Sequence, residues 1–246
     1  MEYREEQSRT AMMLGTSAME KLENARVAVF GVGGVGGHLC EALARAGVGA
    51  IDLFDNDAVS LSNINRQAVA LHSTVGRAKV EVMRERILDI NPDCVVSSHR
   101  VFYLPQNADE YPLERYDYIA DAIDTVSAKV ELAVRAARVG IPMIASMGTG
   151  NRTDPTRFEV TDLFRTEGCP LARVMRRELK ARGIKHLKVV FSSEPTAQPA
   201  NDAPTVLSDR VGGKPIPASL PFVPSVAGLI MAREIVFDLI SKVSLN

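Results

Sequence analysis

The chain of 246 residues contains no tryptophan and only three cysteines, Cys40, Cys94 and Cys169. These cysteines form no Cys-x-x-Cys pair, so the sequence lacks the paired ligand pattern of a structural zinc site. Such sparse cysteine usage is typical of a reducing compartment, and we expect a cytoplasmic protein. Cys40 lies in an apolar helical segment and Cys94 opens a predicted strand, so we interpret both as core residues.

The sequence also lacks a long hydrophobic run. Its longest apolar stretch, residues 222–232, is too short to span a bilayer and contains Pro224 and Gly228. We interpret that stretch as a buried helix or a dimer contact. The N-terminus is polar and has no apolar signal core, so we expect no membrane partner. With 46% hydrophobic residues and no internal repeat, residues 1–246 are predicted to form a single domain.

What the chain does contain is a glycine cluster at a strand-to-helix turn. An apolar strand is predicted over residues 27–30, and Gly31, Gly33, Gly34 and Gly36 follow it ahead of an amphipathic helix. Glycines let a phosphate approach the backbone, and the free N–H groups of the helix start attract an anion. The turn therefore predicts a nucleotide site.

The order of strands and helices predicts the fold. Strands and helices alternate through Ile144, which indicates an α/β fold with a Rossmann-like, doubly wound, mainly parallel sheet. Further strands predicted over residues 157–162 and 187–192 flank a single helix, so we expect a mixed C-terminal extension of the sheet.

The glycine pattern alone does not choose between nucleotides. The strand over residues 50–54 delivers Asp55 about 20 residues beyond the glycines, where an acid typically meets the ribose hydroxyls of NAD or ATP alike. An NAD-dependent oxidoreductase therefore stays open as an alternative.

The polar residues after Asp55 favour a triphosphate. Arg66 and Lys79 supply two cations that a dinucleotide pyrophosphate does not need, and they are our catalytic candidates for holding the departing pyrophosphate. Lys79 could instead be a solvated residue on its helix. The predicted nucleotide-binding residues are Gly31, Gly33, Gly34, Gly36, Asp55, Asp57, Asn63, Arg66, Gln67 and Lys79.

A second carboxylate site follows the strand at residues 118–120. Asp124 is predicted to be catalytic and to hold Mg²⁺, because this hard cation prefers one or two carboxylates together with phosphate oxygens. The alternative is that Asp124 caps the next helix. For Asp121 we expect a structural role.

The second half of the chain carries two further features. Seven of the thirteen prolines lie between Ser193 and Pro224, so residues 193–221 are predicted to form a mobile loop, either a lid over the nucleotide or a surface loop. Residues 173–188 contain seven basic residues and one acid, which suits either tRNA phosphates or a solvated helix face.

The polar site resembles a known family. The run from Gly31 to Gly36, the segment from Asp55 to Gln67, Lys79 and Asp124 look like the adenylation site of the ubiquitin-activating-enzyme-like (ThiF/MoeB-type) superfamily, whose members activate carboxylates with ATP. In that family an N-terminal arginine reaches the triphosphate of the partner subunit. The resemblance therefore implies a homodimer and a catalytic role for Arg9, which could otherwise be a surface residue of an amphipathic helix.

Nearly all of the chain resembles one branch of that superfamily, the tRNA threonylcarbamoyladenosine dehydratases. The segments that carry this resemblance are residues 146–158, 169–176, 192–195 and 222–228. The resemblance implies ATP-dependent cyclisation of threonylcarbamoyladenosine in tRNA, with loss of water, through an acyl-adenylate. It also implies Mg²⁺ and leaves open a monovalent cation near Gly148–Asn151 and a sulfur-relay partner protein.

The main rival function is adenylation of the C-terminus of a ubiquitin-like sulfur-carrier protein. Enzymes of that kind commonly bind zinc through two Cys-x-x-Cys pairs, which this chain lacks. Cys169 precedes a basic helix, where a reactive thiol is conceivable. The cyclisation needs no covalent enzyme intermediate, so we expect the reaction to survive Cys169→Ala.

Overall fold

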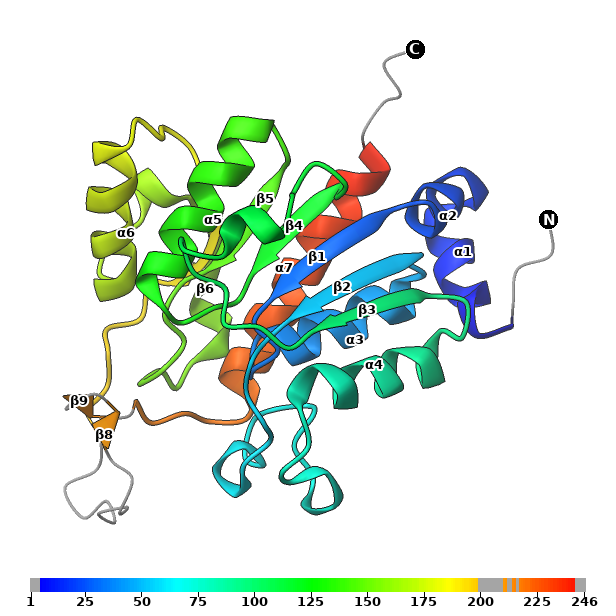
Figure 1. Cartoon of the computed structure of the whole chain (residues 1–246), viewed down its shortest axis with the longest axis horizontal. Helices are drawn as coiled ribbons and strands as arrows, with labels where there is room; N and C mark the ends of the chain where they lie inside the picture. The colour runs from blue at the N-terminus through cyan, green and yellow to red at the C-terminus, as the bar shows by residue number, and fades with distance from the viewer. Residues whose placement is uncertain (1–4, 199–209, 212–213, 216, 242–246) are drawn as a thin grey trace.

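A seven-stranded sheet with helices on both faces forms the centre of the computed structural model (Figure 1). The structure describes residues 5–198, 210–211, 214–215 and 217–241. The strand order is β3-β2-β1-β4-β5-β7-β6. Within this sheet, β6 and β7 pair antiparallel and the other neighbouring strands pair parallel. This confirms the predicted Rossmann-like fold with a mixed C-terminal extension.

The strands are short and mostly buried. Their bounds are β1 (Arg26–Phe30), β2 (Ala50–Phe54), β3 (Val95–His99), β4 (Tyr118–Asp121), β5 (Met143–Ser146), β6 (Phe158–Asp162) and β7 (Lys188–Ser192). Because helices cover both faces of a parallel sheet, central strands such as β1 read as continuous apolar runs. A two-stranded ribbon, β8 (Arg210–Val211) with β9 (Lys214–Pro215), lies apart from this sheet.

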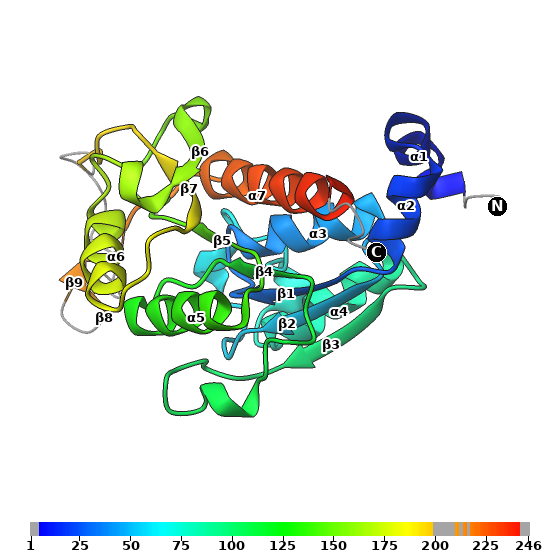
Figure 2. The ribbon, with the colours of Figure 1, turned by 90° about the horizontal axis from the view of Figure 1, so that it is seen from above.

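Seven α-helices lie in the described part of the chain. They are α1 (Ser8–Leu14), α2 (Thr16–Glu23), α3 (Gly36–Ala46), α4 (Lys79–Ile90), α5 (Val126–Val139), α6 (Pro170–Ala181) and α7 (Phe222–Ser241). Helices α3, α4 and α7 share one apolar cluster with the sheet, whereas α5 and α6 share a second cluster on its other face. Figure 2 shows α3 and α7 on the side of β1 and β4 opposite to α5.

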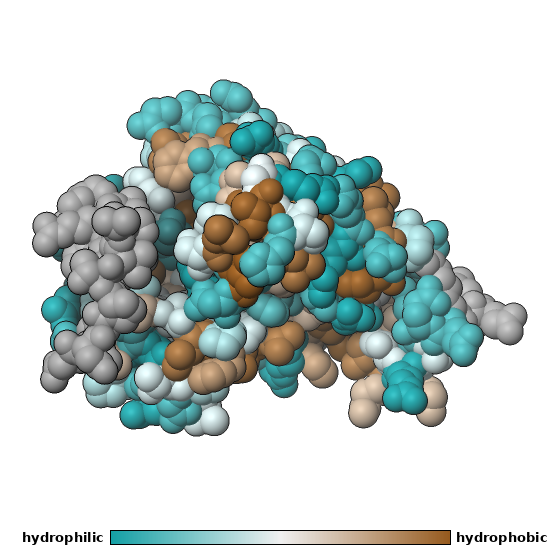
Figure 3. All heavy atoms as spheres, turned by 90° about the horizontal axis from the view of Figure 1, so that it is seen from below, coloured by the Kyte–Doolittle hydropathy of each residue, from teal (hydrophilic) through white to brown (hydrophobic). Residues whose placement is uncertain are grey.

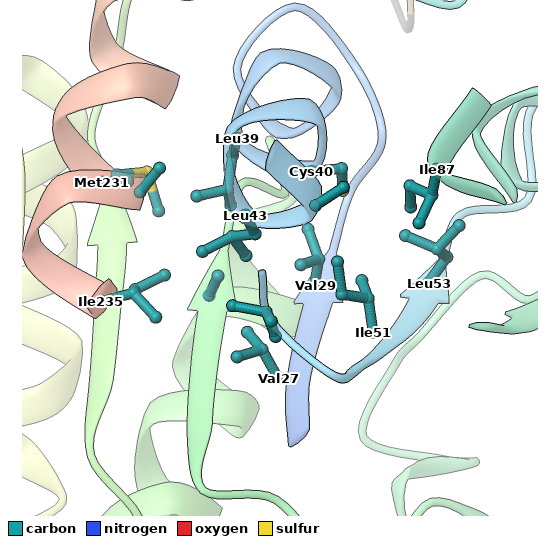
Figure 4. Packing of buried hydrophobic residues seen from close by; sticks show 14 of the residues in the cluster. Val27, Val29, Leu39, Cys40, Leu43, Ile51, Leu53, Ile87, Met231 and Ile235 are labelled. Atoms are coloured by element: carbon teal, nitrogen blue, oxygen red, sulfur yellow. The ribbon is translucent and has the colours of Figure 1, made fainter. Parts of the chain in front are cut away.

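The first cluster joins the glycine turn to the C-terminal helix. Figure 4 shows Val27 and Val29 of β1 facing Leu39 and Leu43 of α3, with Met231 of α7 alongside. The predicted apolar stretch at 222–232 is thus the first half of a largely buried helix, as expected. Helices α3 and α7 approach closely because Gly228 lies where an added Cβ would come within 2.3 Å of the Val35 carbonyl oxygen.

Some details differ from the expectations. The apolar periodicity of α5 predicts Val130, Ala133, Val134 and Ala137 on its inner side, but Ala137 is exposed, while the neighbouring Ala136 and the charged Lys129 are buried. Cys40 and Cys94 are buried, as predicted. The predicted mobile loop at 193–221 includes residues 199–209, 212–213 and 216, which lie outside the described residues.

Within the described residues, no helix is both long enough and apolar enough to cross a membrane. On the face in Figure 3, apolar side chains form several separate patches divided by hydrophilic ones.

Candidate active site

A cavity of about 570 Å³ opens where the strands β1, β2, β3 and β4 end. The register places Phe30, Phe54, His99 and Asp121 in one row across these strands, so the turns that follow them meet at one edge of the sheet. This is the edge at which α/β sheets bind ligands, and the volume is within the range of about 300–1,000 Å³ for small-molecule sites.

The glycine turn forms one wall of this cavity. Gly31 has a φ of +89°, and an added Cβ would lie 2.6 Å from the Ala122 carbonyl oxygen. At Gly36 an added Cβ would lie 1.8 Å from the Gly31 carbonyl oxygen. Gly31, Gly33 and Gly34 line the cavity, whereas Gly36 does not and instead keeps the turn tight. The start of α3 has no side-chain cap, and the Gly37 N–H donates to the Gly33 carbonyl at 2.9 Å within the turn.

Asp55 connects the glycine turn to the loop after β2. Its Oδ2 accepts the Val32 N–H at 2.7 Å, and its Oδ1 accepts the Asp57 N–H at 2.8 Å. Burial raises the pKa of Asp55 above its ordinary value, although the nearby Lys79 charge opposes that rise. The acid thus lies at the cavity wall, at the position predicted for a ribose contact.

The predicted cations both reach the cavity. Lys79 begins α4, is buried, and its Nζ lies 2.7 Å from Asp57 Oδ2. The alternative of a solvated Lys79 is therefore wrong. Arg66 donates to the Ser62 carbonyl at 3.0 Å and to Asn65 Oδ1 at 2.8 Å, and burial lowers the pKa of its guanidinium.

Asn63 and Gln67 complete this polar wall. Asn63 is buried and its Oδ1 accepts the Ser60 N–H at 3.1 Å. Gln67 is buried too, and its Oε1 has no hydrogen-bond partner within the described residues. Burying an amide oxygen without a hydrogen-bond partner costs free energy, so we expect a bound ligand to donate a hydrogen bond to it.

Asp124 lines the same cavity, from the turn after β4. It is exposed, and its Oδ1 accepts the Thr125 hydroxyl at 3.3 Å. The cap position of α5 belongs to Thr125, so the alternative role of Asp124 as a helix cap is wrong. In the described part of the chain, no three His, Cys, Asp or Glu residues are placed to hold a metal together.

Asp121 has the structural role that was expected. It is fully buried and its Oδ2 lies 2.8 Å from the Nζ of Lys129, which is also fully buried. Burial raises the pKa of Asp121, and the Lys129 charge opposes this. Asp121 accepts the Ile123 N–H at 3.0 Å and Lys129 donates to the Ile123 carbonyl at 3.2 Å. This ion pair therefore holds the turn that presents Asp124.

The sequence analysis missed an aromatic wall. Phe30 and Phe54 stack with ring centroids 4.2 Å apart, and Tyr103 meets Phe30 edge-on at 4.9 Å. All three line the cavity together with Phe102. Burial raises the pKa of Tyr103 to about 12. The available signal was the aromatic pair directly after the third predicted strand, at the same sheet edge as the glycines.

Two segments that carried the family resemblance meet beside the cavity. The Glu194 carboxylate accepts the Thr153 N–H and hydroxyl and the Asp154 N–H, at 2.8 to 3.1 Å. Asn151, at a φ of +55°, accepts the Ala197 N–H and donates to the Ala218 carbonyl, both at 2.8 Å. Thr149 of this turn lines the cavity. Both described ends of the 193–221 segment are therefore anchored next to the site.

Arg9 and Cys169 are not part of the cavity lining. Arg9 is exposed on α1, and α1 and α2 precede the amino end of β1, away from the cavity at its carboxyl end (Figure 1). Cys169 is buried directly before α6. Burial raises the pKa of the Cys94 thiol to about 11 and raises that of Cys40 as well.

The fold and the site together define a class. The class is that of nucleotide-binding enzymes that adenylate carboxylates. They combine a Rossmann-like sheet with a glycine turn that faces an arginine, a lysine and separate carboxylates. Within that class the chain belongs to the ThiF family, whose sequence profile matches residues 7–243.

Similar proteins narrow the family further. The chain is 42% identical over 244 residues to a tRNA threonylcarbamoyladenosine dehydratase of Bacillus subtilis, covering 97% of this chain and 96% of that protein. It is 42% identical over 201 residues to an Escherichia coli protein of the same name, covering 78% and 75% of the two chains. The chain thus belongs to the threonylcarbamoyladenosine dehydratase branch.

Solved structures agree with this placement. An E. coli tRNA N6-threonylcarbamoyladenosine dehydratase in complex with ATP has a TM-score of 0.87 and 36% identity, covering 97% of this chain and 95% of that one. By contrast, an adenylyltransferase and sulfurtransferase of Aspergillus terreus is 35% identical over only 133 residues, covering 54% of this chain and 27% of that protein.

Proposed function

We propose that this protein uses ATP to dehydrate threonylcarbamoyladenosine in tRNA to its cyclic form, through an acyl-adenylate. The observation that carries this proposal is the single cavity lined by the glycine turn, Arg66, Lys79 and Asp124. Relatives that match nearly the whole chain bear this enzyme name, and a similar structure contains ATP. The NAD alternative is set aside because a dehydrogenase would leave the two cations without a role.

The proposed reaction has two steps. A carboxylate oxygen of the substrate attacks the α-phosphorus of ATP, which forms the mixed anhydride and releases pyrophosphate. A nitrogen of the same modification then attacks the acyl carbon, AMP leaves, and the nitrogen loses its proton. The net change in the tRNA is the loss of one water. Holding both groups in one cavity makes the second step effectively unimolecular.

We assign roles to the side chains from their places in the cavity. Arg66, with its planar fork, and Lys79, with its single ammonium, line the cavity, where they would bind the β- and γ-phosphates and neutralise charge on the leaving pyrophosphate. Lys79 is held by Asp57 at 2.7 Å, which pre-positions its charge. Asp55 lies beside the glycine turn, where it would accept ribose hydroxyls.

Asp124 is the residue that would hold Mg²⁺. Its carboxylate is exposed in the cavity, and within the described residues it hydrogen-bonds only to the Thr125 hydroxyl, so its oxygens are accessible to a cation. One carboxylate with phosphate oxygens and water is the donor set that Mg²⁺ prefers, which suits a site without a cluster of acids. When bound, the ion would neutralise charge on the phosphates.

We further propose that the enzyme is a homodimer in which Arg9 of one subunit serves the partner's cavity. Arg9 lies far from the cavity of its own chain, so it would reach a nucleotide only from another copy. A tRNA-modifying enzyme works where tRNA is found, hence the cytoplasm. The sulfur-relay protein and the monovalent cation near Gly148–Asn151 stay predictions.

The test is mass analysis of tRNA that carries threonylcarbamoyladenosine, incubated with the protein, ATP and Mg²⁺. We expect loss of one water with the wild type, and a decrease of about 100-fold or more in rate for Arg66→Ala and for Asp124→Asn. Arg84→Ala and Asp89→Asn on the exposed face of α4 are the matched controls.

The variants must also keep the fold, which their circular dichroism spectra would show. Unchanged tRNA mass with the wild type would contradict the proposed function. Near wild-type rates in either cavity variant would remove that residue from the site.

A further inference from the structure

A strongly basic surface covers the outer side of α6 and the residues next to it. Residues 165–188 contain eight basic and two acidic residues, in a chain whose formal net charge is −1. We define the basic surface as the exposed residues Arg165, Arg173, Arg177, Lys180 and Lys185. Within the described residues, only Arg177 among them has an acidic partner, Glu178. The surface therefore keeps most of its charge.

Three other cations of this segment do not belong to the surface. Arg176 turns toward Thr166 and donates to its carbonyl oxygen at 2.6 Å and to its hydroxyl. Lys188 contacts Glu234 and Asp238 of α7, at 3.3 and 2.6 Å. Arg182 is exposed but shares Glu178 with Arg177, so the two arginines together leave one net positive charge and only Arg177 is counted. The sequence had suggested one continuous stripe through Lys188, and the structure shortens it.

The basic surface begins at the rim of the cavity. Cys169 and Leu171, at the start of α6, flank Gly148, since an added Cβ there would lie 4.0 Å from Cys169 Sγ and 3.9 Å from Leu171 Cβ. The next residue, Thr149, lines the cavity. The twelve residues of α6 extend for about 18 Å. Figure 1 shows α6 beside α5, on the far side of the molecule from α1 and α2.

We propose that the basic surface binds the tRNA phosphate backbone while the modified base enters the adjacent cavity, an inference that rests on the proposed function. Arginine and lysine bind phosphates without reading sequence, and a base in a single-stranded loop can turn out of its stack into a pocket. Arg173, Arg177 and Lys180 are spaced by four and three residues, so they lie on one face of the helix. The charge of the basic surface and its position beside the cavity therefore both fit tRNA.

The variant Arg173→Ala/Lys180→Ala tests the proposal, because neither residue has an acidic partner in the described chain. Binding of an unmodified tRNA transcript is measured by fluorescence anisotropy at several salt concentrations. We expect the Kd to rise about tenfold or more, and the slope of log K against log salt to fall by about 1 to 2, since each contact contributes about 0.7 to 0.9.

Kinetics and a matched control separate binding from folding. In the dehydration assay we expect the variant to raise the KM for tRNA and to leave kcat and stabilisation by ATP unchanged. Arg45→Ala/Arg84→Ala, which removes two exposed cations from α3 and α4, should leave tRNA affinity as it was.

Two outcomes distinguish the inference from the proposed function. If the wild type dehydrates its substrate but the α6 variant keeps its tRNA affinity and salt slope, the basic surface does not bind tRNA. If the wild type forms no product while the variant still loses tRNA affinity, the proposed function is wrong and the surface is an RNA-binding one.

Discussion

At the scale of single residues, the buried pair of Asp121 and Lys129 supports the active site without entering it. Both side chains are fully buried, 2.8 Å apart, and both hold Ile123 in the turn that ends at Asp124. Removing one partner of a buried pair leaves an uncompensated charge, which costs more than the pair itself contributes. The pair thus keeps the carboxylate of Asp124 in place.

We predict that Lys129→Met lowers the free energy of unfolding by about 3–5 kcal/mol at neutral pH. Burial already raises the pKa of Asp121, and losing the Lys129 charge would raise it further. A carboxyl whose folded pKa is raised stabilises the fold only where it is protonated, so the deficit should shrink as the pH falls. Urea unfolding at pH 8 and pH 5 measures this difference.

The double variant Asp121→Asn/Lys129→Met is the control, since it removes both charges. It should recover part of the stability, and its deficit should depend less on pH. A single variant as stable as the wild type at pH 8 would show that Lys129 does not compensate Asp121.

Residues that line the cavity are easier to predict from the sequence than the residues that hold them in position. Arg66, Lys79 and Asp124 were predictable because each follows a strand or turn whose position the glycine cluster defines. Lys129 was not, because a lysine within a helix is normally solvated and only tertiary packing buries it. Phe102 and Tyr103 were missed because aromatic residues after a strand are as typical of a core as of a binding wall.

At the scale of elements, the contact between α3 and α7 determines where the glycine turn lies. Gly228 of α7 faces the Val35 carbonyl, and Pro224 of the same helix lies within 3.2 Å of an added Cβ on Gly34. Val35 and Gly34 both line the cavity. Helix α7 therefore packs against the glycine turn and supports it.

We predict that Gly228→Ala lowers the free energy of unfolding by about 1–3 kcal/mol, although alanine favours helix by up to about 1 kcal/mol. The new methyl group would come within 2.3 Å of a backbone oxygen, so α7 must shift. Stabilisation by ATP should weaken too, which thermal unfolding with and without ATP measures. Leu229→Ala, at a position that is 50% exposed, is the control. Equal or greater stability of Gly228→Ala would contradict this account of the contact.

The order of elements was predictable because apolar periodicity differs between buried strands and amphipathic helices. The inner face of α5 was harder to predict, because several alanines close together do not define a face. Ala136 rather than Ala137 is buried. The ribbon of β8 and β9 was not predicted, because two-residue strands leave no periodic pattern.

At the scale of the whole molecule, the first helix gives reason to expect a second copy. Met12 and Met13 are 86% and 84% exposed, on the same short helix as Arg9. Apolar side chains so exposed are typical of a surface that another chain covers. A symmetric dimer would bury these methionines and carry Arg9 toward the partner's cavity.

We predict that Arg9→Ala and Asp124→Asn are each inactive as separate preparations but regain activity when their subunits are exchanged. In a mixed dimer, one cavity has an intact Asp124 and receives the intact Arg9 of its partner. Random exchange should then restore about one quarter of wild-type activity, because half of the dimers are mixed and one of their two sites is complete. If Arg9 acts within its own chain, mixing restores nothing.

Four parallel strands end at the same edge of the sheet, and this arrangement has an evolutionary consequence. The glycines, the polar residues from Asp55 to Lys79, the aromatic pair Phe102–Tyr103 and Asp124 each follow a different strand, so one turn can change length or composition while the others keep their places. A change confined to one of these turns can therefore alter what the cavity accepts and leave the glycine turn in place.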